Sequence, residues 1–249
     1  MSEPSADVLA PTMRKLEKRF RFTPDDRAAF LALPLSRKKL NIGSYIVREA
    51  DTAHNCCVLL SGFAYRHKIV GSGARQIVSI HIPGDMVDLH NSFLGVADHN
   101  VQMLTPGEVA LIPARAVQDI AYNYPAIGRA MLLDTLVDGS IFREWIANVG
   151  RRDARSRVAH LLCEFAVRLQ AVGESEVRNY HLPMTQEQLA DATGLTSVHV
   201  NRTIQSLRHD GLISTDKRSI TIENWAGLVR TGDFNTAYLH RESVEGQPY

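Results

Sequence analysis

The stretch from Met184 to Ile213 constrains the fold of this chain most strongly, because it predicts two helices joined by a tight turn. Thr185 as an N-cap and Gln188 three residues later form a capping-box pattern for the first helix. Gly194 is expected to end this helix, because the residue after a helix often needs a positive φ that glycine adopts at no steric cost. Thr196 then caps the second helix.

The second helix of this stretch has two faces of different chemistry. Val200, Ile204 and Leu207 recur at helical spacing, so they are expected to face a core. The other face carries short side chains, amides and a guanidinium, on Ser197, Val198, Asn201, Arg202 and Gln205. A helix with such groups near its N-terminal end is suited to enter the major groove of DNA. The alternative is an ordinary helical hairpin with no role in DNA binding.

A short hairpin is predicted directly after the second helix. The strands Leu212–Thr215 and Ser219–Ile222 flank a turn that contains Lys217 and Arg218, so two cations lie where a phosphate backbone would pass. His199 is expected to contact phosphate as well. A recognition helix followed by such a hairpin is the pattern of a winged DNA-binding domain.

These motifs resemble the winged helix-turn-helix of the CRP/FNR family of bacterial transcription regulators. The resemblance extends over nearly the whole chain and implies an α+β fold. Its expected parts are N-terminal helices and a cyclic-nucleotide-binding-like β-roll (a jelly roll) in 1–124, a long dimerisation helix with a hinge in 125–150, and a winged helix-turn-helix in 151–249. It also implies a homodimeric, sequence-specific regulator that binds an inverted repeat in double-stranded DNA, has RNA polymerase as a partner, and is not an enzyme.

Many short strands separated by glycines are predicted between Lys39 and Ile112, which is typical of a small jelly roll or barrel. Ser61-Gly62 and Pro83-Gly84-Asp85 fall where the turn glycines of the family's β-roll lie. The expected strands are Leu40–Ile42, Tyr45–Val47, Cys56–Leu60, Phe63–Ile69, Gln76–Ile82, Met86–Val87, Val101–Leu104 and Val109–Ile112.

A long helix is predicted from Pro125 to about Asn148, and it carries two adjacent apolar stripes. One stripe has coiled-coil-like spacing and consists of Leu132, Leu136, Gly139 and Ile146. The other consists of Leu133, Val137, Ile141 and Trp145. We expect the second to pack on the roll and the first on another copy of the chain, and the alternative is a single buried face. The segment 149–152 is expected to break the helix and form the hinge.

The roll departs from the family pattern where cyclic nucleotides bind. The resemblance implies a Gly-Glu pair near Asp88 and an Arg-Ser pair near Asp98, and neither pair is present. The loop from Pro83 to Met103 contains no Arg or Lys to neutralise a phosphate. We therefore expect an allosteric ligand other than cyclic AMP, bound by a candidate effector loop that comprises Asp88, Leu89, His90, Asp98, His99 and Asn100.

Cysteine and histidine usage predicts neither an iron–sulfur cluster nor a metal site. The cluster-binding branch of the family uses four cysteine ligands, and this chain has three. Cys56 and Cys57 are adjacent on a strand, so one should point inward and the other outward, and the exposed one is open to a redox role. His81, His90 and His99 with Asp88 and Asp98 have the right residue types for a metal, but their spacing matches no established motif. We therefore assign no metal ligands.

Composition narrows the classes of protein to which this chain can belong. The net charge is +1, so attraction to DNA must come from locally placed cations. The chain shows no signal peptide and no apolar run long enough for a membrane span, so we expect a cytoplasmic protein with no membrane partner. The alternative function is a metal-dependent enzyme or binding protein built on the β-roll. Such a protein would require a close His-x-His pair as metal ligands, and the roll contains none.

Overall fold

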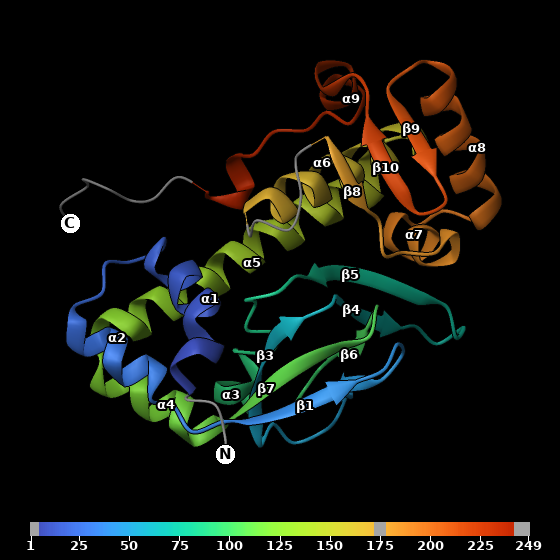
Figure 1. Ribbon diagram of the computed structural model, residues 1–249. Coiled ribbons are helices and arrows are strands. Elements are labelled where there is room, and N and C mark those ends of the chain that lie inside the picture. The colour runs from blue at the N-terminus through green and yellow to red at the C-terminus, as the bar shows by residue number, and fades with distance from the viewer. Residues whose placement is uncertain (1–4, 172–177, 242–249) are drawn as a thin grey trace. The chain divides into compact units, whose positions relative to one another are not determined.

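The computed structural model describes residues 5–171 and 178–241, and Figure 1 shows their helices and strands. The chain divides into two compact units, and each is made of segments that are not contiguous in sequence. The first contains 1–66, 80–140 and 239–249, and the second contains 67–79 and 141–238. The division falls inside a long helix, between Ser140 and Ile141. Within the described residues, no helix is both long and apolar enough for a membrane span.

The roll is built from seven strands in two sheets. One sheet has the order β1-β7-β3 and the other the order β2-β6-β4-β5. The strands are β1 (Ser36–Leu40), β2 (Tyr45–Val47), β3 (Asn55–Ser61), β4 (Ala64–Ile69), β5 (Arg75–His81), β6 (Asn100–Met103) and β7 (Gly107–Pro113). The expected strand at Met86–Val87 is only an isolated bridge between Met86 and Val58. The β-roll prediction is confirmed by this arrangement.

Strand β3 shows how alternation builds the interior of the roll. Cys56 and Val58 belong to one buried apolar cluster, whereas Cys57 and Leu59 belong to a second. Successive side chains of a strand point to opposite faces, so a strand with both faces covered buries a continuous apolar run. The first cluster also includes Leu16 of α1 (Ser5–Glu17) and residues of α2 (Pro24–Leu31), so these helices cover that face of the sheet.

Helix α4 (Ala114–Asn123) leads from the roll into α5 (Pro125–Arg151), the longest helix of the chain's described residues. The expected break at 149–152 is wrong for its first three residues, because α5 continues through Arg151. A single glycine costs a helix interior only about 1 kcal/mol, which the surrounding turns tolerate at Gly150. The next helix begins after Asp153, whose carboxylate accepts the backbone N–H of Ser156 at 2.8 Å.

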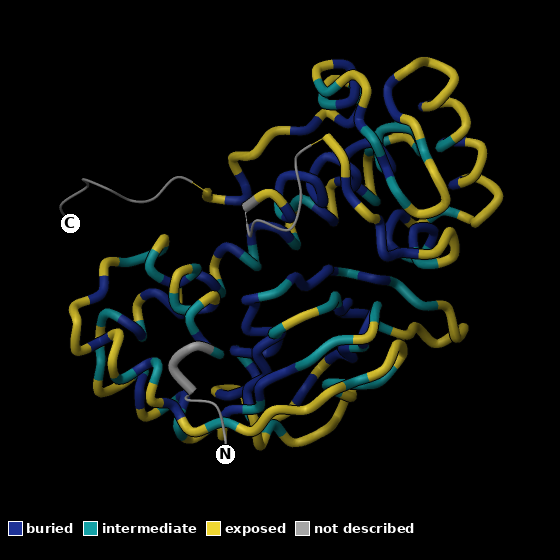
Figure 2. Tube along the Cα trace, viewed as in Figure 1, coloured by how far each residue is buried: buried dark blue, intermediate teal, exposed yellow. Residues whose placement is uncertain are grey.

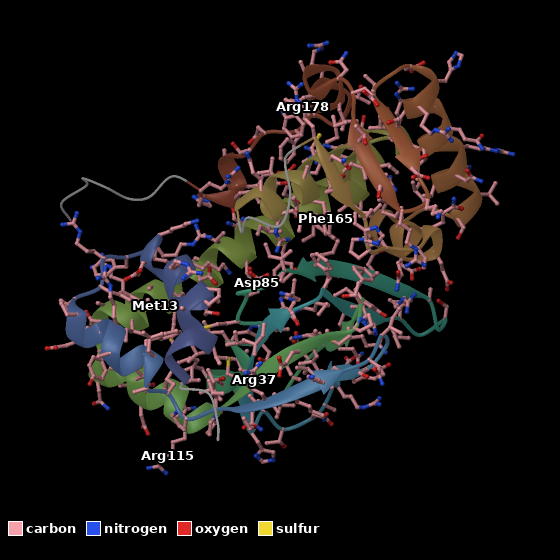
Figure 3. All side chains as sticks on the ribbon, viewed as in Figure 1. Met13, Arg37, Asp85, Arg115, Phe165 and Arg178 are labelled. Carbon is pink, nitrogen blue, oxygen red and sulfur yellow. The ribbon has the colours of Figure 1, made fainter. Side chains whose placement is uncertain are left out.

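The second unit contains a helical core and a three-stranded sheet of order β8-β10-β9. Its elements are α6 (Ala154–Ala171), β8 (Asn179–His181), α7 (Gln186–Thr193), α8 (Ser197–His209), β9 (Ile213–Asp216), β10 (Ser219–Ile222), α9 (Trp225–Thr231) and the 3-10 helix η1 (Ala237–Leu239). Phe165 of α6, labelled in Figure 3, packs with Tyr180 of β8 at a ring-centroid distance of 5.7 Å. Strand β8 was not predicted, because three residues are too few for a periodic signal.

A buried carboxylate joins three elements of this unit. Glu164 of α6 accepts the indole N–H of Trp145 at 3.0 Å and the phenol O–H of Tyr238 at 2.7 Å. Trp145 lies near the end of α5 and Tyr238 lies in η1. Hydrogen bonds to a charged group are stronger than neutral ones, so this carboxylate fixes the end of α5 against α6.

Candidate DNA-binding surface and effector loop

The helix-turn-helix of the second unit has the caps that its sequence predicts. Thr185 Oγ1 accepts the N–H of Gln188 at 3.2 Å, and Gln188 Oε1 accepts the N–H of Thr185 at 2.8 Å. Gly194 ends α7 with a φ of +64°. Thr196 Oγ1 accepts the N–H of His199 at the start of α8. These local contacts set the angle at which α8 leaves the turn.

Helix α8 buries one face and exposes the other, as Figure 2 shows by colour. Val200 and Leu207 are fully buried, and Ile204 is half-buried. Thr203 is also buried, although its polarity gave no signal for this position. The residues predicted for base and phosphate contact on this helix are all exposed, namely Ser197, Val198, His199, Asn201, Arg202 and Gln205. In Figure 3, nitrogen-bearing side chains extend outward from α8.

Two arginines of α6 hold the helix-turn-helix in place, and the sequence did not predict this role for them. Arg155 donates to Ser206 Oγ and pairs with the carboxylate of Asp210, so it fixes the C-terminal end of α8. Arg157 donates to the carbonyl oxygen of Thr193 at 3.1 Å, so it fixes the end of α7. The only sequence signal was the presence of arginines in the first turn of α6, which carries no partner information.

The wing is an antiparallel hairpin with its cations at the tip. Strand β9 pairs with β10 in the register Ser219 to Asp216 and Ile222 to Ile213. Lys217 and Arg218 occupy the turn and are both exposed, and Lys217 has a φ of +53°. The left-handed conformation at Lys217 closes the hairpin within two residues. Both cations therefore lie in the turn of the hairpin, as the sequence predicts.

The two apolar stripes of α5 differ sharply in burial. Val137, Ile141 and Trp145 of the second stripe are buried. Three members of the first stripe are large apolar side chains that remain exposed, with 58% for Leu132, 57% for Leu136 and 72% for Ile146. Gly139, between them on the same face, is half-exposed. The two stripes therefore differ in burial, whereas the packing of one on the roll and of the other on a second copy stays a prediction.

The residues of the candidate effector loop have separate roles in the structure. Asp88 is buried, and its Oδ1 accepts the N–H of Cys57 at 2.8 Å. Burial raises the pKa of Asp88 to about 6, against the opposing effects of this hydrogen bond and of Arg66. Leu89 packs in the core, and Asn100 Oδ1 accepts the N–H of Glu49 at 3.1 Å. These three residues are therefore structural parts of the roll.

The other three residues of the loop come together. One potential ligand atom from each of His90, Asp98 and His99 lies within 4.8 Å of the other two. His99 Nδ1 is 2.6 Å from Asp98 Oδ1, and the rings of His90 and His99 have centroids 5.3 Å apart. Among the described residues, His81 and Asp88 lie outside this group.

A buried arginine lies near the loop, and the sequence did not predict it there because it comes from β4 and not from the loop itself. Arg66 is 3% exposed and donates to the carbonyl oxygen of Val87. Burial lowers the pKa of Arg66, and the charges of nearby carboxylates oppose that shift. These carboxylates belong to Asp138, Asp88, Asp98 and Asp85. The loop therefore has a cation beside it, but one that is surrounded by acidic groups.

The adjacent cysteines are both buried, which corrects the expectation that one of them is exposed. Cys56 and Cys57 point to opposite faces of β3, but both faces are covered. Burial raises the pKa of both thiols well above the ordinary value, and Asp88 adds to the shift. A thiol held in its protonated form is a poor nucleophile. Cys163 is buried as well, and burial raises its pKa to about 12.

Family models and similar sequences both support a regulator with a nucleotide-binding-type roll and a helix-turn-helix. A cyclic nucleotide-binding domain model matches 37–124, and a Crp-like helix-turn-helix domain model matches 156–231. The transcriptional activator protein FnrL of Cereibacter sphaeroides is 27% identical over 191 residues, which are 75% of this chain and 76% of FnrL. The anaerobic regulatory protein of Haemophilus influenzae is 26% identical over 200 residues, which are 78% and 75% of the two chains.

Solved structures show the same fold. The structure of FixK2 from Bradyrhizobium japonicum has a TM-score of 0.71 at 21% identity, and the similarity covers 80% of this chain and 98% of FixK2. The relatives are transcription regulators and not enzymes, so nothing favours a metal-dependent enzyme built on the roll. With a nucleotide-binding-type roll, a long helix and a winged helix-turn-helix, this chain belongs to the CRP/FNR family of DNA-binding transcription regulators.

Proposed function

We propose that the protein acts as a homodimer that reads an inverted-repeat DNA site with α8 of each copy. The observation that carries this proposal is the outward face of α8, where Asn201, Arg202 and Gln205 are exposed while Val200 and Leu207 anchor the opposite face. A helix held in this way can enter the major groove without loss of its own core contacts. Lys217 and Arg218 of the wing would hold the phosphate backbone beside it.

The dimer in this proposal forms along α5. Leu132, Leu136 and Ile146 leave a stripe of large apolar side chains exposed on a continuous helix. Parallel packing of two such helices about a two-fold axis would cover the stripe, and it would also give the inverted symmetry of the DNA site. RNA polymerase is the expected partner of the DNA-bound dimer.

Control of DNA binding would pass from the roll through α5. A ligand that binds one arrangement of the dimer more tightly than another shifts the population toward it. The break at Arg152 and Asp153 is the point at which α6 can change its angle to α5. The ligand would bind at the candidate effector loop, and the acidic surroundings of Arg66 argue against the phosphate of cyclic AMP.

Selection of bound sequences from random double-stranded DNA tests this proposal directly. We expect enrichment of an inverted repeat with half-site centres about 10 base pairs apart, and cell extract should change the yield if an effector is present. A variant that carries both Asn201→Ala and Arg202→Ala is the matched control, and it should enrich no such repeat. Enrichment of single half-sites would contradict the dimer, and failure to enrich any sequence would contradict the assigned reading face.

A further inference from the structure

Two turns of the effector loop bring three metal-ligand side chains together. His90 lies just before α3 (Asn91–Leu94), and Asp98 and His99 lie just before β6. Gly95, at a φ of +85°, reverses the chain after α3. The return segment is then fixed by backbone hydrogen bonds from Ala97 to the carbonyl oxygen of Asp51 and from Ala50 to that of Ala97. The side chains are therefore held by the roll and not by a free loop.

The donor set that results is two imidazoles and one carboxylate. These ligands suit zinc and other divalent first-row transition ions, and three protein ligands leave coordination positions open for water or a small molecule. We propose that His90, Asp98 and His99 form a binding site for such an ion, and that this ion is the signal read by the roll. The regulatory half of this inference rests on the proposed function, whereas the metal site itself does not.

The contact between Asp98 and His99 brings a carboxylate oxygen and an imidazole nitrogen within 2.6 Å of each other. A divalent ion that bound both atoms would replace the proton that they share, because a carboxylate oxygen and a neutral imidazole nitrogen are both metal ligands.

The local charge favours a cation over an anion. Arg66 is near His90 and opposes a positive ion. The same guanidinium, however, interacts with the carboxylates of Asp138, Asp88, Asp98 and Asp85. Asp85 pairs with Lys15 at 3.1 Å, and Lys15 also acts on Asp138, so the carboxylates of Asp88 and Asp98 remain against the guanidinium. The remaining negative charge stabilises a divalent cation and repels a phosphate. Cys56 and Cys57 do not compete strongly for the ion, because their buried thiols stay protonated.

Titration of the full-length, chelator-treated protein with Co²⁺ and with Zn²⁺ tests the site. Calorimetry should give one ion per protomer, and bound Co²⁺ should show visible ligand-field bands without the near-ultraviolet charge-transfer band of thiolate ligands. His90→Ala and His99→Ala should each weaken binding at least tenfold. Asp98→Asn, at a side chain that is 82% exposed and therefore tolerant of change, should weaken it while circular dichroism stays unchanged.

The matched control is His54→Ala, which removes an exposed imidazole of the same unit outside the cluster and should bind metal like the original protein. If the three cluster variants also bind like the original protein, the contact is an ordinary Asp98–His99 ion pair and the site is excluded. A thiolate band would likewise exclude it, by placing the ion on cysteine.

DNA affinity measured with and without Zn²⁺ separates this inference from the proposed function. We expect Zn²⁺ to change the affinity of the original protein for its selected site, and to leave that of His99→Ala unchanged. A protein that binds the inverted repeat but no metal would contradict only the metal site. A protein that binds the metal but no DNA sequence would contradict the proposed function and leave the site standing.

Discussion

Arg202 and Lys217 are both exposed cations, but their positions predict different contributions to DNA binding. Arg202, on the outward face of α8, can make a bidentate contact to guanine worth about 1–3 kcal/mol of discrimination. Lys217, at the tip of the wing, is expected to contact only phosphate, which carries no sequence information. We expect Arg202→Ala to relax the preference for one guanine per half-site, and Lys217→Ala to weaken binding to all sequences and flatten the salt dependence.

Fluorescence anisotropy on the selected site and on random DNA, at several salt concentrations, measures both effects. Val198 offers a further check, because it has no acceptor for cytosine and can only contact a methyl group such as that of thymine. An equal loss of affinity on specific and random DNA for Arg202→Ala would show that this side chain contacts the backbone.

Gly194 and Gly211 share a φ of +64° but differ in their surroundings, so they form a matched pair. A Cβ at Gly194 would lie 2.9 Å from Val149 Cγ1, whereas a Cβ at Gly211 would meet nothing within 4 Å. Gly211→Ala should cost only the left-handed strain of about 1–2 kcal/mol. Gly194→Ala should cost about 1–3 kcal/mol more, because Val149 must move. Urea denaturation measures the free energy of unfolding of both variants. Equal losses would mean that Val149 moves away from the new Cβ at no cost.

Asp88 should make stability depend on pH. Its pKa of about 6 lies above the ordinary 3.8, so the folded state binds the proton more tightly and loses stability as the pH rises from about 4 to about 6. Asp88→Asn does not titrate and keeps an oxygen for the N–H of Cys57. The variant should therefore gain up to roughly 3 kcal/mol relative to the original protein over that range.

Unfolding free energies from urea denaturation at pH 4.5 and pH 7.5 test this expectation. Asp216→Asn, at an exposed position of the wing, controls for general effects of removing a charge. A difference between Asp88→Asn and the original protein that stays constant with pH would show that the Asp88 carboxylate is solvated in the folded state.

Among the elements, those with strong local signals were predicted well. The capping box at Thr185 and the apolar spacing of Val200 and Leu207 fixed the helix-turn-helix, because caps and periodicity act within a few residues. Helix α3 and strand β8 were missed, since elements of three or four residues carry almost no periodicity. The end of α5 was misplaced at about Asn148, because the effect of Gly150 on helix propensity is weak and the rest of a long helix overrides it.

The exposed stripe of α5 predicts the oligomeric state. Leu136→Glu would place two like charges across the two-fold axis of the proposed dimer, at a cost on the order of several kcal/mol. We expect the variant to be monomeric by light scattering. Ile42→Glu is the matched control, because Ile42 is 61% exposed and lies far along the chain in the roll, so it should leave the dimer intact. A Leu136→Glu variant that remains dimeric would show that the interface lies elsewhere.

At the scale of the whole molecule, the sequence predicted which residues are exposed better than which side chains meet. Asp88 and Asn100 matched the expected loop by position, but the roll uses both as acceptors for backbone N–H groups. Arg66 could not be predicted, because β4 brings it to the loop from outside the loop's own sequence. Contacts between segments far apart in the chain depend on strand register and packing, which local patterns do not encode.

The surroundings of Arg66 lead to the prediction for cyclic AMP. The phosphate of a cyclic nucleotide needs a cation, and the loop from Pro83 to Met103 supplies no Arg or Lys. Arg66 is the nearby alternative, but it already donates to the carbonyl oxygen of Val87 and lies among carboxylates that include Asp88 and Asp98. A phosphate that approached Arg66 would therefore be repelled by these carboxylates.

Cyclic AMP at millimolar concentration should consequently neither raise the melting temperature nor change the affinity for the selected DNA. The measurement is sensitive, because a ligand present at 100 times its Kd stabilises a protein by about 2.7 kcal/mol, which shifts the melting temperature by several degrees. Binding with a Kd of about 10 μM would thus be plain in a thermal scan at about 1 mM ligand. A clear shift with cyclic AMP that is absent in Arg66→Gln would show that Arg66 leaves its carboxylates to bind the phosphate, and that the roll binds cyclic AMP.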